Sequence, residues 1–132
     1  MQPKDAKTVL IVDDEFAIVE ALTEILNWEG FTVMSAGNGR IALEVLGRER
    51  VDLVLMDAMM PVMGGVEAAA AMKADPRLRE IPIILMTAGP MPVGEVRWVA
   101  ALRKPFQLDA FEAAIRNAVG ALGVITSSED GA

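Results

Sequence analysis

Short apolar runs alternate along the chain with longer segments in which apolar residues recur every three or four positions. Runs of roughly four to eight mostly apolar residues, bounded by polar or turn-forming residues, are typical of buried β-strands. Five such runs predict strands, at residues 8–12, 31–34, 51–56, 81–86 and 98–102. The intervening segments are long enough for helices, so we expect strands and helices to alternate.

The segment after the first strand has the clearest helical pattern. Its apolar residues fall on one face at helical spacing, with charged residues opposite and Gly30 as a stop signal. That face comprises Ile18, Val19, Leu22, Ile25 and Leu26. Further helices are predicted at 38–47, 66–74 and 108–122. The two prolines and two glycines within residues 87–95 predict that the fourth helix, between the last two strands, is short or irregular.

Strands that alternate with helices predict crossover connections and an α/β fold. The expected architecture is a doubly wound, five-stranded parallel sheet with helices on both faces. We find no repeat, linker or second domain, so residues 1–125 are expected to form one domain, followed by a flexible C-terminal tail at 126–132.

Composition narrows the possible functions. The chain has 132 residues and 53% hydrophobic residues, which is sufficient for one core without cross-links. Its formal charge of −7 argues against nucleic acid or an anionic membrane as a direct partner. Without cysteine or histidine, it has no thiol nucleophile, zinc-thiolate site or histidine base. We expect a cytoplasmic protein, because the N-terminus lacks a signal peptide and no apolar run reaches the roughly 18 residues of a membrane span.

Polar residues of a particular kind follow four of the predicted strands. They are Asp13, Asp14 and Glu15 after the first strand, Asp57 after the third, Thr87 after the fourth and Lys104 after the fifth. In a parallel sheet these strand ends lie along one edge, where ligands bind. Carboxylates with a hydroxyl and an ammonium group favour a site for Mg²⁺ and a phosphoryl group.

Each of these residues also has a structural explanation when considered alone. Asp13 and Asp14 fit the start of the following helix, where carboxylates meet the helix dipole favourably. Asp57 fits an ordinary loop residue, Thr87 a turn former and Lys104 a solvated charge. Their joint occurrence at the ends of the predicted strands favours a functional site.

Four stretches of the chain, in order, resemble the receiver domains of two-component response regulators. They are VLIVDDE (residues 9–15), DLVLMDAMMPVMGG (52–65), IILMTA (83–88) and KPF (104–106). The resemblance spans about residues 8 to 122, and it is the combination that is specific. It implies a flavodoxin-like strand order of 2-1-3-4-5 and assigns the receiver domain to residues 1–125.

The same resemblance implies the role of each site residue. Asp57 is the expected phosphate acceptor, and Asp13 and Asp14, with Asp57 and the backbone carbonyl of Met59, are the expected Mg²⁺ ligands. Thr87 and Lys104 are expected to contact the phosphoryl oxygens. Mg²⁺ would offset the repulsion between the carboxylates and a dianionic phosphoryl donor.

The resemblance also implies the partners of the chain. The phosphohistidine comes from a sensor histidine kinase or a histidine phosphotransfer protein, so the chain needs no histidine of its own. A downstream effector protein of unknown identity receives the signal. The chain is not expected to be an enzyme, beyond catalysing its own phosphorylation and dephosphorylation.

Two features depart from the family pattern. Ala101 stands where these domains usually carry Tyr or Phe, three residues before the site lysine, and the interval from Thr87 to Lys104 is shorter than usual. An alternative function is therefore a receiver-like scaffold that binds its partner independently of phosphorylation.

Two classes of enzyme also fit this fold but not these residues. A phosphatase with an aspartate nucleophile usually has a second Asp where this chain has Met59. A flavin-binding protein needs a hydroxyl- and glycine-rich first loop, whereas residues 13–16 (DDEF) would repel a flavin phosphate.

Overall fold

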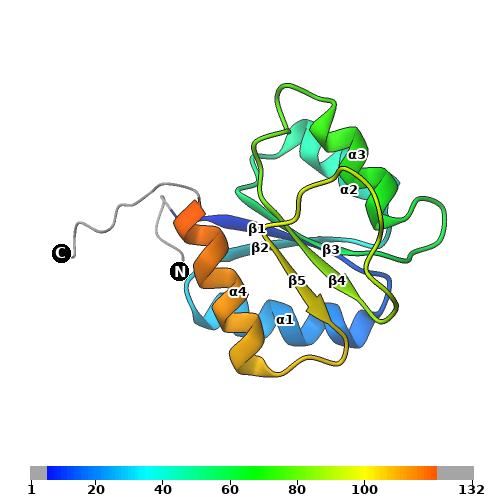
Figure 1. Ribbon diagram of the computed structural model, residues 1–132. Helices are drawn as coiled ribbons and strands as arrows, with labels where there is room; N and C mark the ends of the chain where they lie inside the picture. Colours follow the sequence, from blue (N-terminus) through cyan, green and yellow to red (C-terminus); the bar gives the residue numbers. More distant parts are fainter. Residues whose placement is uncertain (1–5, 122–132) are drawn as a thin grey trace.

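The computed structural model describes residues 6–121, so the predicted tail at 126–132 lies outside the described part (Figure 1). The strands are β1 (Thr8–Val12), β2 (Thr32–Ala36), β3 (Leu53–Asp57), β4 (Ile83–Thr87) and β5 (Ala100–Arg103). The helices are α1 (Phe16–Trp28), α2 (Gly39–Arg48), α3 (Gly65–Lys73) and α4 (Leu108–Ala121). Apart from the short or irregular helix expected between the last two strands, every predicted strand and helix is present, with small shifts at its ends. Among residues 6–121, no helix is both long and apolar enough to cross a membrane.

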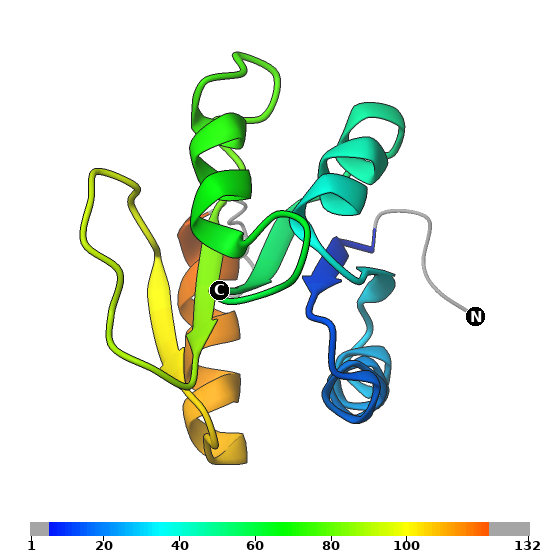
Figure 2. The same ribbon diagram turned by 90° about the vertical axis from the view of Figure 1, so that its right-hand side faces the viewer.

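The five strands form one parallel sheet in the order β2-β1-β3-β4-β5, which confirms the predicted fold class. Helices α1 and α4 cover one face of the sheet, and α2 and α3 cover the other (Figures 1 and 2). This arrangement follows from the strand-helix alternation, because each crossover places its helix on a face of the sheet.

The residues of β1 show how the strands divide the core into two layers. Val9 and Ile11 pack with the α1 and α4 side, while Leu10 and Val12 pack with the α2 and α3 side. All four are fully buried. Successive side chains of a strand point to opposite faces, so a strand covered on both faces is a continuous apolar run.

The segment 88–99 joins β4 to β5 without a helix, as the prediction of a short or irregular fourth helix anticipated. Its later part packs against the core of the α2 and α3 side through Val96 and Trp98. Beside it, a groove of about 440 Å³ lies against α3 and is lined by Val66, Ala70 and Val93, among others. The segment therefore covers part of the α2 and α3 face of the sheet, although it has no regular secondary structure.

Candidate functional site

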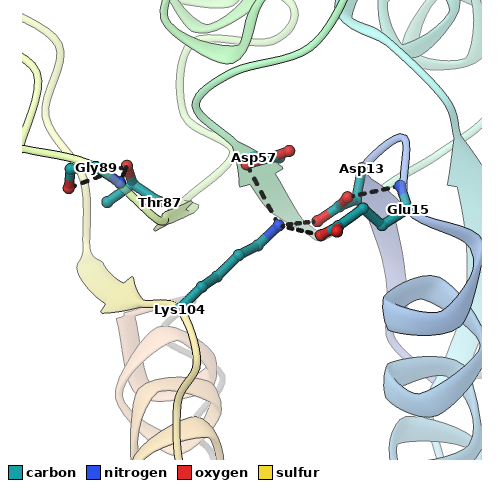
Figure 3. A network of polar contacts seen from close by, with 6 residues as sticks. All are labelled: Asp13, Glu15, Asp57, Thr87, Gly89 and Lys104. Atoms are coloured by element: carbon teal, nitrogen blue, oxygen red, sulfur yellow. Dashed lines mark hydrogen bonds and ion pairs between the residues drawn. The ribbon is translucent and has the colours of Figure 1, made fainter.

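The carboxyl ends of β1, β3, β4 and β5 bring the predicted site residues to one edge of the sheet (Figure 3). Asp57 and Thr87 are the last residues of β3 and β4, while Asp13 and Lys104 directly follow β1 and β5. The strand register places these ends side by side, with Asp57 paired to Met86 and Thr87 to Arg103. Residues distant in sequence therefore converge, as the prediction required.

Lys104 connects the two buried carboxylates of the site. Its Nζ lies 2.8 Å from Asp13 Oδ2, 3.2 Å from Glu15 Oε1 and 3.5 Å from Asp57 Oδ1. Burial alone would lower the pKa of Lys104, but its hydrogen bonds to Asp13 and Glu15, together with the negative charges of Asp13 and Asp57, outweigh that effect and raise the pKa. Lys104 is consequently a charged member of the site, and the alternative that it is only a solvated surface charge does not hold.

Asp13 is a buried acceptor at the start of the acidic cluster. One of its carboxylate oxygens accepts a hydrogen bond from the Glu15 backbone N–H at 2.9 Å, and the other accepts from Lys104. The N-cap of α1 is Glu15, and its side chain makes no capping hydrogen bond. The alternative reading of Asp13 and Asp14 as helix caps is therefore not what the structure shows.

Asp57 is buried at the centre of the site, with only 5% of its surface exposed. Its pKa is raised, first by burial and then by the nearby charge of Asp13, while Lys104 and a hydrogen bond from the Met59 backbone N–H act in the opposite direction. Repulsion between Asp13 and Asp57 is thus only partly relieved by the lysine. A cation at this place would relieve it further.

Three carboxylates have the geometry of a cation site. Oxygen atoms of Asp13, Asp14 and Asp57 all lie within 4.8 Å of one another, and Asp14 is exposed to solvent. Hard oxygen donors of this kind, with one side open to water, suit Mg²⁺, which usually keeps several water ligands. The residues present therefore fit the predicted ion. Met59 lies two residues beyond Asp57, and its side chain is 77% exposed.

Thr87 is buried at the end of β4, and its hydroxyl is engaged away from Asp57 (Figure 3). The hydroxyl oxygen accepts a hydrogen bond from the Gly89 backbone N–H at 3.0 Å, and it lies 3.4 Å from the Gly89 carbonyl oxygen. The guanidinium group of Arg103 donates to the same carbonyl at 2.8 Å. Thr87 is therefore linked to the first residues of the 88–99 segment.

The loop between β3 and α3 is held close to Asp57 by a glycine. A Cβ atom placed on Gly65 would lie 2.0 Å from the backbone carbonyl oxygen of Asp57, so only glycine fits. Gly65 also donates its N–H to the Ala58 carbonyl at 3.0 Å. In the same loop, Val62 has a positive φ of 70°, which is rare for a β-branched residue.

Contacts made to the site residues by Glu15, Gly89 and Arg103 were not predicted from the sequence. Glu15 was noted as part of the acidic run, but its contact with Lys104 was not predicted. Gly89 and Arg103 carry no motif, and the link between them depends on the path of the 88–99 segment. The Lys104–Pro105 bond is cis.

Comparison with known proteins gives the same result as the fold and site. Residues 9–116 match the family model of the response regulator receiver domain. The chain is 39% identical over 114 residues to sporulation initiation phosphotransferase F of Bacillus subtilis, a match covering 82% of this chain and 90% of that protein. The chain belongs to the receiver domain family of response regulators, and it is a component of two-component signalling.

Two further matches define the extent of the similarity. The chain is 39% identical over 80 residues to the DNA-binding response regulator MtrA of Mycobacterium tuberculosis, but that match spans only 34% of MtrA. A crystal structure of the response regulator TrrA from Thermotoga maritima, in complex with Mg²⁺ and BeF, is 30% identical with a TM-score of 0.76. That match covers 85% of this chain and 98% of TrrA. Receiver domains of this family interact with histidine kinases and phosphotransfer proteins.

Proposed function

We propose that this receiver domain accepts a phosphoryl group on Asp57 in a Mg²⁺-dependent reaction and thereby switches its binding to a downstream protein. The observation that carries the proposal is the position of Asp57. Its buried carboxylate lies within 4.8 Å of those of Asp13 and Asp14, and Lys104 Nζ is 3.5 Å from it. A nucleophile, a cation site and a fixed positive charge are thus present together.

The proposed reaction transfers one phosphoryl group from a histidine to an aspartate. A carboxylate oxygen of Asp57 attacks the phosphorus atom of the donor's phosphohistidine, and a P–O bond forms. The P–N bond breaks, and its electron pair stays on the imidazole nitrogen of the donor. The product is an acyl phosphate, so Asp57 must react in its ionised form.

The residues around Asp57 have complementary roles in this proposal. Asp13, Asp14, Asp57 and the Met59 carbonyl would hold Mg²⁺, whose contribution is to offset the negative charge of the carboxylates and the phosphoryl group.

Lys104 supplies a fixed positive charge to the transferred oxygens, and the Thr87 hydroxyl donates a hydrogen bond to one of them after it turns from Gly89. The same groups would support the domain's own phosphorylation by small donors and its dephosphorylation.

The donor in this proposal is a sensor histidine kinase or a histidine phosphotransfer protein, and the reaction takes place in the cytoplasm. We assign the receiver domain to residues 1–125. The DNA-binding activity in the name of MtrA belongs to a protein of which this chain matches about a third, so it is not part of the proposal. The downstream partner is a protein of unknown identity.

Intact mass spectrometry after incubation with acetyl phosphate and Mg²⁺ tests the acceptor. The parent protein should gain one phosphoryl group, and Asp57→Asn should gain none. Asp52→Asn is the matched control, because Asp52 precedes β3 at the opposite end of the same strand, where it accepts a hydrogen bond from Thr8. Labelling of Asp57→Asn to the extent of the parent would show that the acceptor lies elsewhere.

A phosphorylation-independent scaffold is the alternative function, and Ala101 favours it. Ala101 is exposed on β5 and offers no aromatic ring that could turn inward, and the crossover before β5 is irregular chain at residues 88–99 where a regular crossover has a helix. The two functions are separated by measuring how much of a partner protein is captured by the Asp57→Asn variant and by the parent bound to Mg²⁺ and beryllofluoride. Equal capture of the same partner by both forms would support the scaffold.

A further inference from the structure

The contacts of Gly89 connect the site to the 88–99 segment through two different side chains. Its N–H donates to Thr87 Oγ1 at 3.0 Å, and its carbonyl oxygen accepts from Arg103 Nη1 at 2.8 Å (Figure 3 shows the Thr87 side of this link). Thr87 is one of the site residues, whereas Arg103 is exposed on β5 and contacts no carboxylate of the site. Gly89 is therefore held from the buried side and from the surface at once.

Thr87 cannot serve Gly89 and a phosphoryl group equally well. A hydroxyl has one proton to donate, and in this structure the nearest acceptor for it is the Gly89 carbonyl oxygen, at 3.4 Å. If the Thr87 hydroxyl donates this proton to a phosphoryl oxygen on Asp57, it can no longer donate it to the Gly89 carbonyl oxygen. Movement of the hydroxyl towards Asp57 also lengthens its bond to the Gly89 N–H. Phosphorylation and the Thr87–Gly89 turn therefore compete for one side chain.

We propose that Arg103 is a positioning residue that holds the 88–99 segment in its resting position and so opposes phosphorylation of Asp57. The turn closed by Thr87 directs the Gly89 carbonyl towards Arg103, so opening the turn also weakens the Arg103 contact. The hydrogen bond is assisted by the charge of the guanidinium group, which makes it one of the stronger kinds. The free energy of the Arg103–Gly89 hydrogen bond is then lost when Thr87 moves towards Asp57.

The position of Arg103 explains why a receiver with Ala101 can still transmit a signal. Ala101 and Arg103 are both exposed on β5, and Arg103 pairs in register with Thr87 on β4. The 88–99 segment returns to the sheet through Val96 and Trp98, which pack against the core. Displacement of Gly89 at one end is thereby carried towards a partly buried tryptophan at the other.

This inference rests on the proposed function of Asp57, and linkage gives it a distinctive consequence. A contact present only in the resting state reduces the affinity for any ligand that selects the other state, by the same factor that it stabilises the resting state. Removing the Arg103 guanidinium should therefore strengthen the binding of Mg²⁺ with beryllofluoride. A residue with a merely structural role would leave that affinity unchanged or weaken it.

The experiment measures beryllofluoride affinity by calorimetry, in the presence of Mg²⁺, for the parent and for Arg103→Ala. Because Arg103 is exposed to solvent, we expect its contact to contribute no more than a typical intramolecular hydrogen bond, so binding should be roughly three- to tenfold tighter in Arg103→Ala. Arg97→Ala is the matched control, since Arg97 is exposed within the 88–99 segment and carries the same charge as Arg103. Arg103→Lys, which keeps a donor, should return part of the way to the parent affinity.

Thr87→Ala completes a double-mutant cycle. Without the hydroxyl there is no competition for Gly89, so Arg103→Ala should have no effect on affinity in the Thr87→Ala background. Hydrogen exchange of residues 88–95 in the absence of the mimic should be roughly three- to tenfold faster in Arg103→Ala than in Arg97→Ala.

Trp98 provides an optical readout. In a Trp28→Phe background it is the only remaining tryptophan, because the chain has two.

The outcomes separate this inference from the proposed function. If the parent binds beryllofluoride at Asp57 and Arg103→Ala binds it equally or more weakly, the role of Arg103 is wrong while the phosphoryl site stands. If the parent binds no beryllofluoride, the proposed function fails and the switching role of Arg103 fails with it. Tighter binding in both Arg103→Ala and Arg97→Ala would reduce the effect to net charge and also overturn the inference.

Discussion

The loop after Asp57 contains a residue whose backbone conformation is unfavourable for its side chain. Val62 has a φ of 70°, in the left-handed region, where an L-residue is less stable by about 1–2 kcal/mol and a β-branched one is especially rare. Asparagine adopts this region readily. We therefore expect Val62→Asn to increase the free energy of unfolding.

The magnitude depends on what the valine side chain contributes. It is 71% exposed, so it buries less than a third of its surface. Full burial of a valine contributes about 1.5–3 kcal/mol, so truncation should cost about 0.5–0.9 kcal/mol. Relief of about 1–2 kcal/mol of backbone strain then gives a net gain of about 0.1–1.5 kcal/mol for Val62→Asn.

Val62→Ala is the matched control, because it loses the same side-chain contacts but keeps the backbone penalty. Asn should exceed Ala in stability by about 1–2 kcal/mol, which corresponds to a shift of about 0.3–2 M in the urea midpoint. Urea unfolding in EDTA measures both without interference from bound cations. If Val62→Asn is no more stable than Val62→Ala, the strain argument is refuted.

Three further predictions concern packing, protonation and the cation site. Gly65→Ala should lower the free energy of unfolding by more than about 2 kcal/mol, because its Cβ would clash with the Asp57 carbonyl oxygen. Gly47→Ala, at a helical position with open space around it, should instead raise the free energy of unfolding by about 0.5–1 kcal/mol. Urea unfolding compares the two variants. Burial raises the pKa of Asp57, so its stabilising contribution is complete below the ordinary Asp pKa of about 3.9 and is lost as the pH rises through the folded-state pKa. In EDTA the parent should therefore lose stability relative to Asp57→Asn as the pH rises above about 4, and parallel curves would contradict this. Asp14→Ala should abolish Mg²⁺ binding more completely than Asp13→Ala in calorimetry. Asp13→Ala, which removes a buried partner of Lys104, should also lower the free energy of unfolding by about 3–5 kcal/mol.

The sequence predicted the sheet and the edge where the candidate site residues meet, because both depend on short-range patterns. A buried parallel strand must be a continuous apolar run, and the first polar residue after it is then forced to the carboxyl edge. This is why Asp13, Asp57 and Thr87 were found without knowledge of the fold. The strand boundaries shifted slightly, since a pattern of hydrophobicity does not show where backbone pairing begins.

The remaining features depend on the three-dimensional path of the chain. Nothing in the sequence near Arg103 or Gly89 shows that their side chain and carbonyl meet, because that contact requires the irregular 88–99 segment to return beside β5. The positive φ of Val62 is similarly hidden, since a valine predicts extended backbone. The contact of Glu15 with Lys104 requires both strand ends to be fixed first.

The irregular 88–99 segment has a consequence for how this protein could diverge from its relatives. A helix satisfies its own backbone groups and offers a partner only side chains. An irregular segment leaves main-chain N–H and C=O groups accessible, so a partner that binds here can recognise the backbone itself. Side-chain identity at exposed positions such as Val93 is then free to drift, while insertions or deletions that alter the path are not. Specificity for a partner at this surface would then depend on the length of the segment and on the positions of its prolines and glycines.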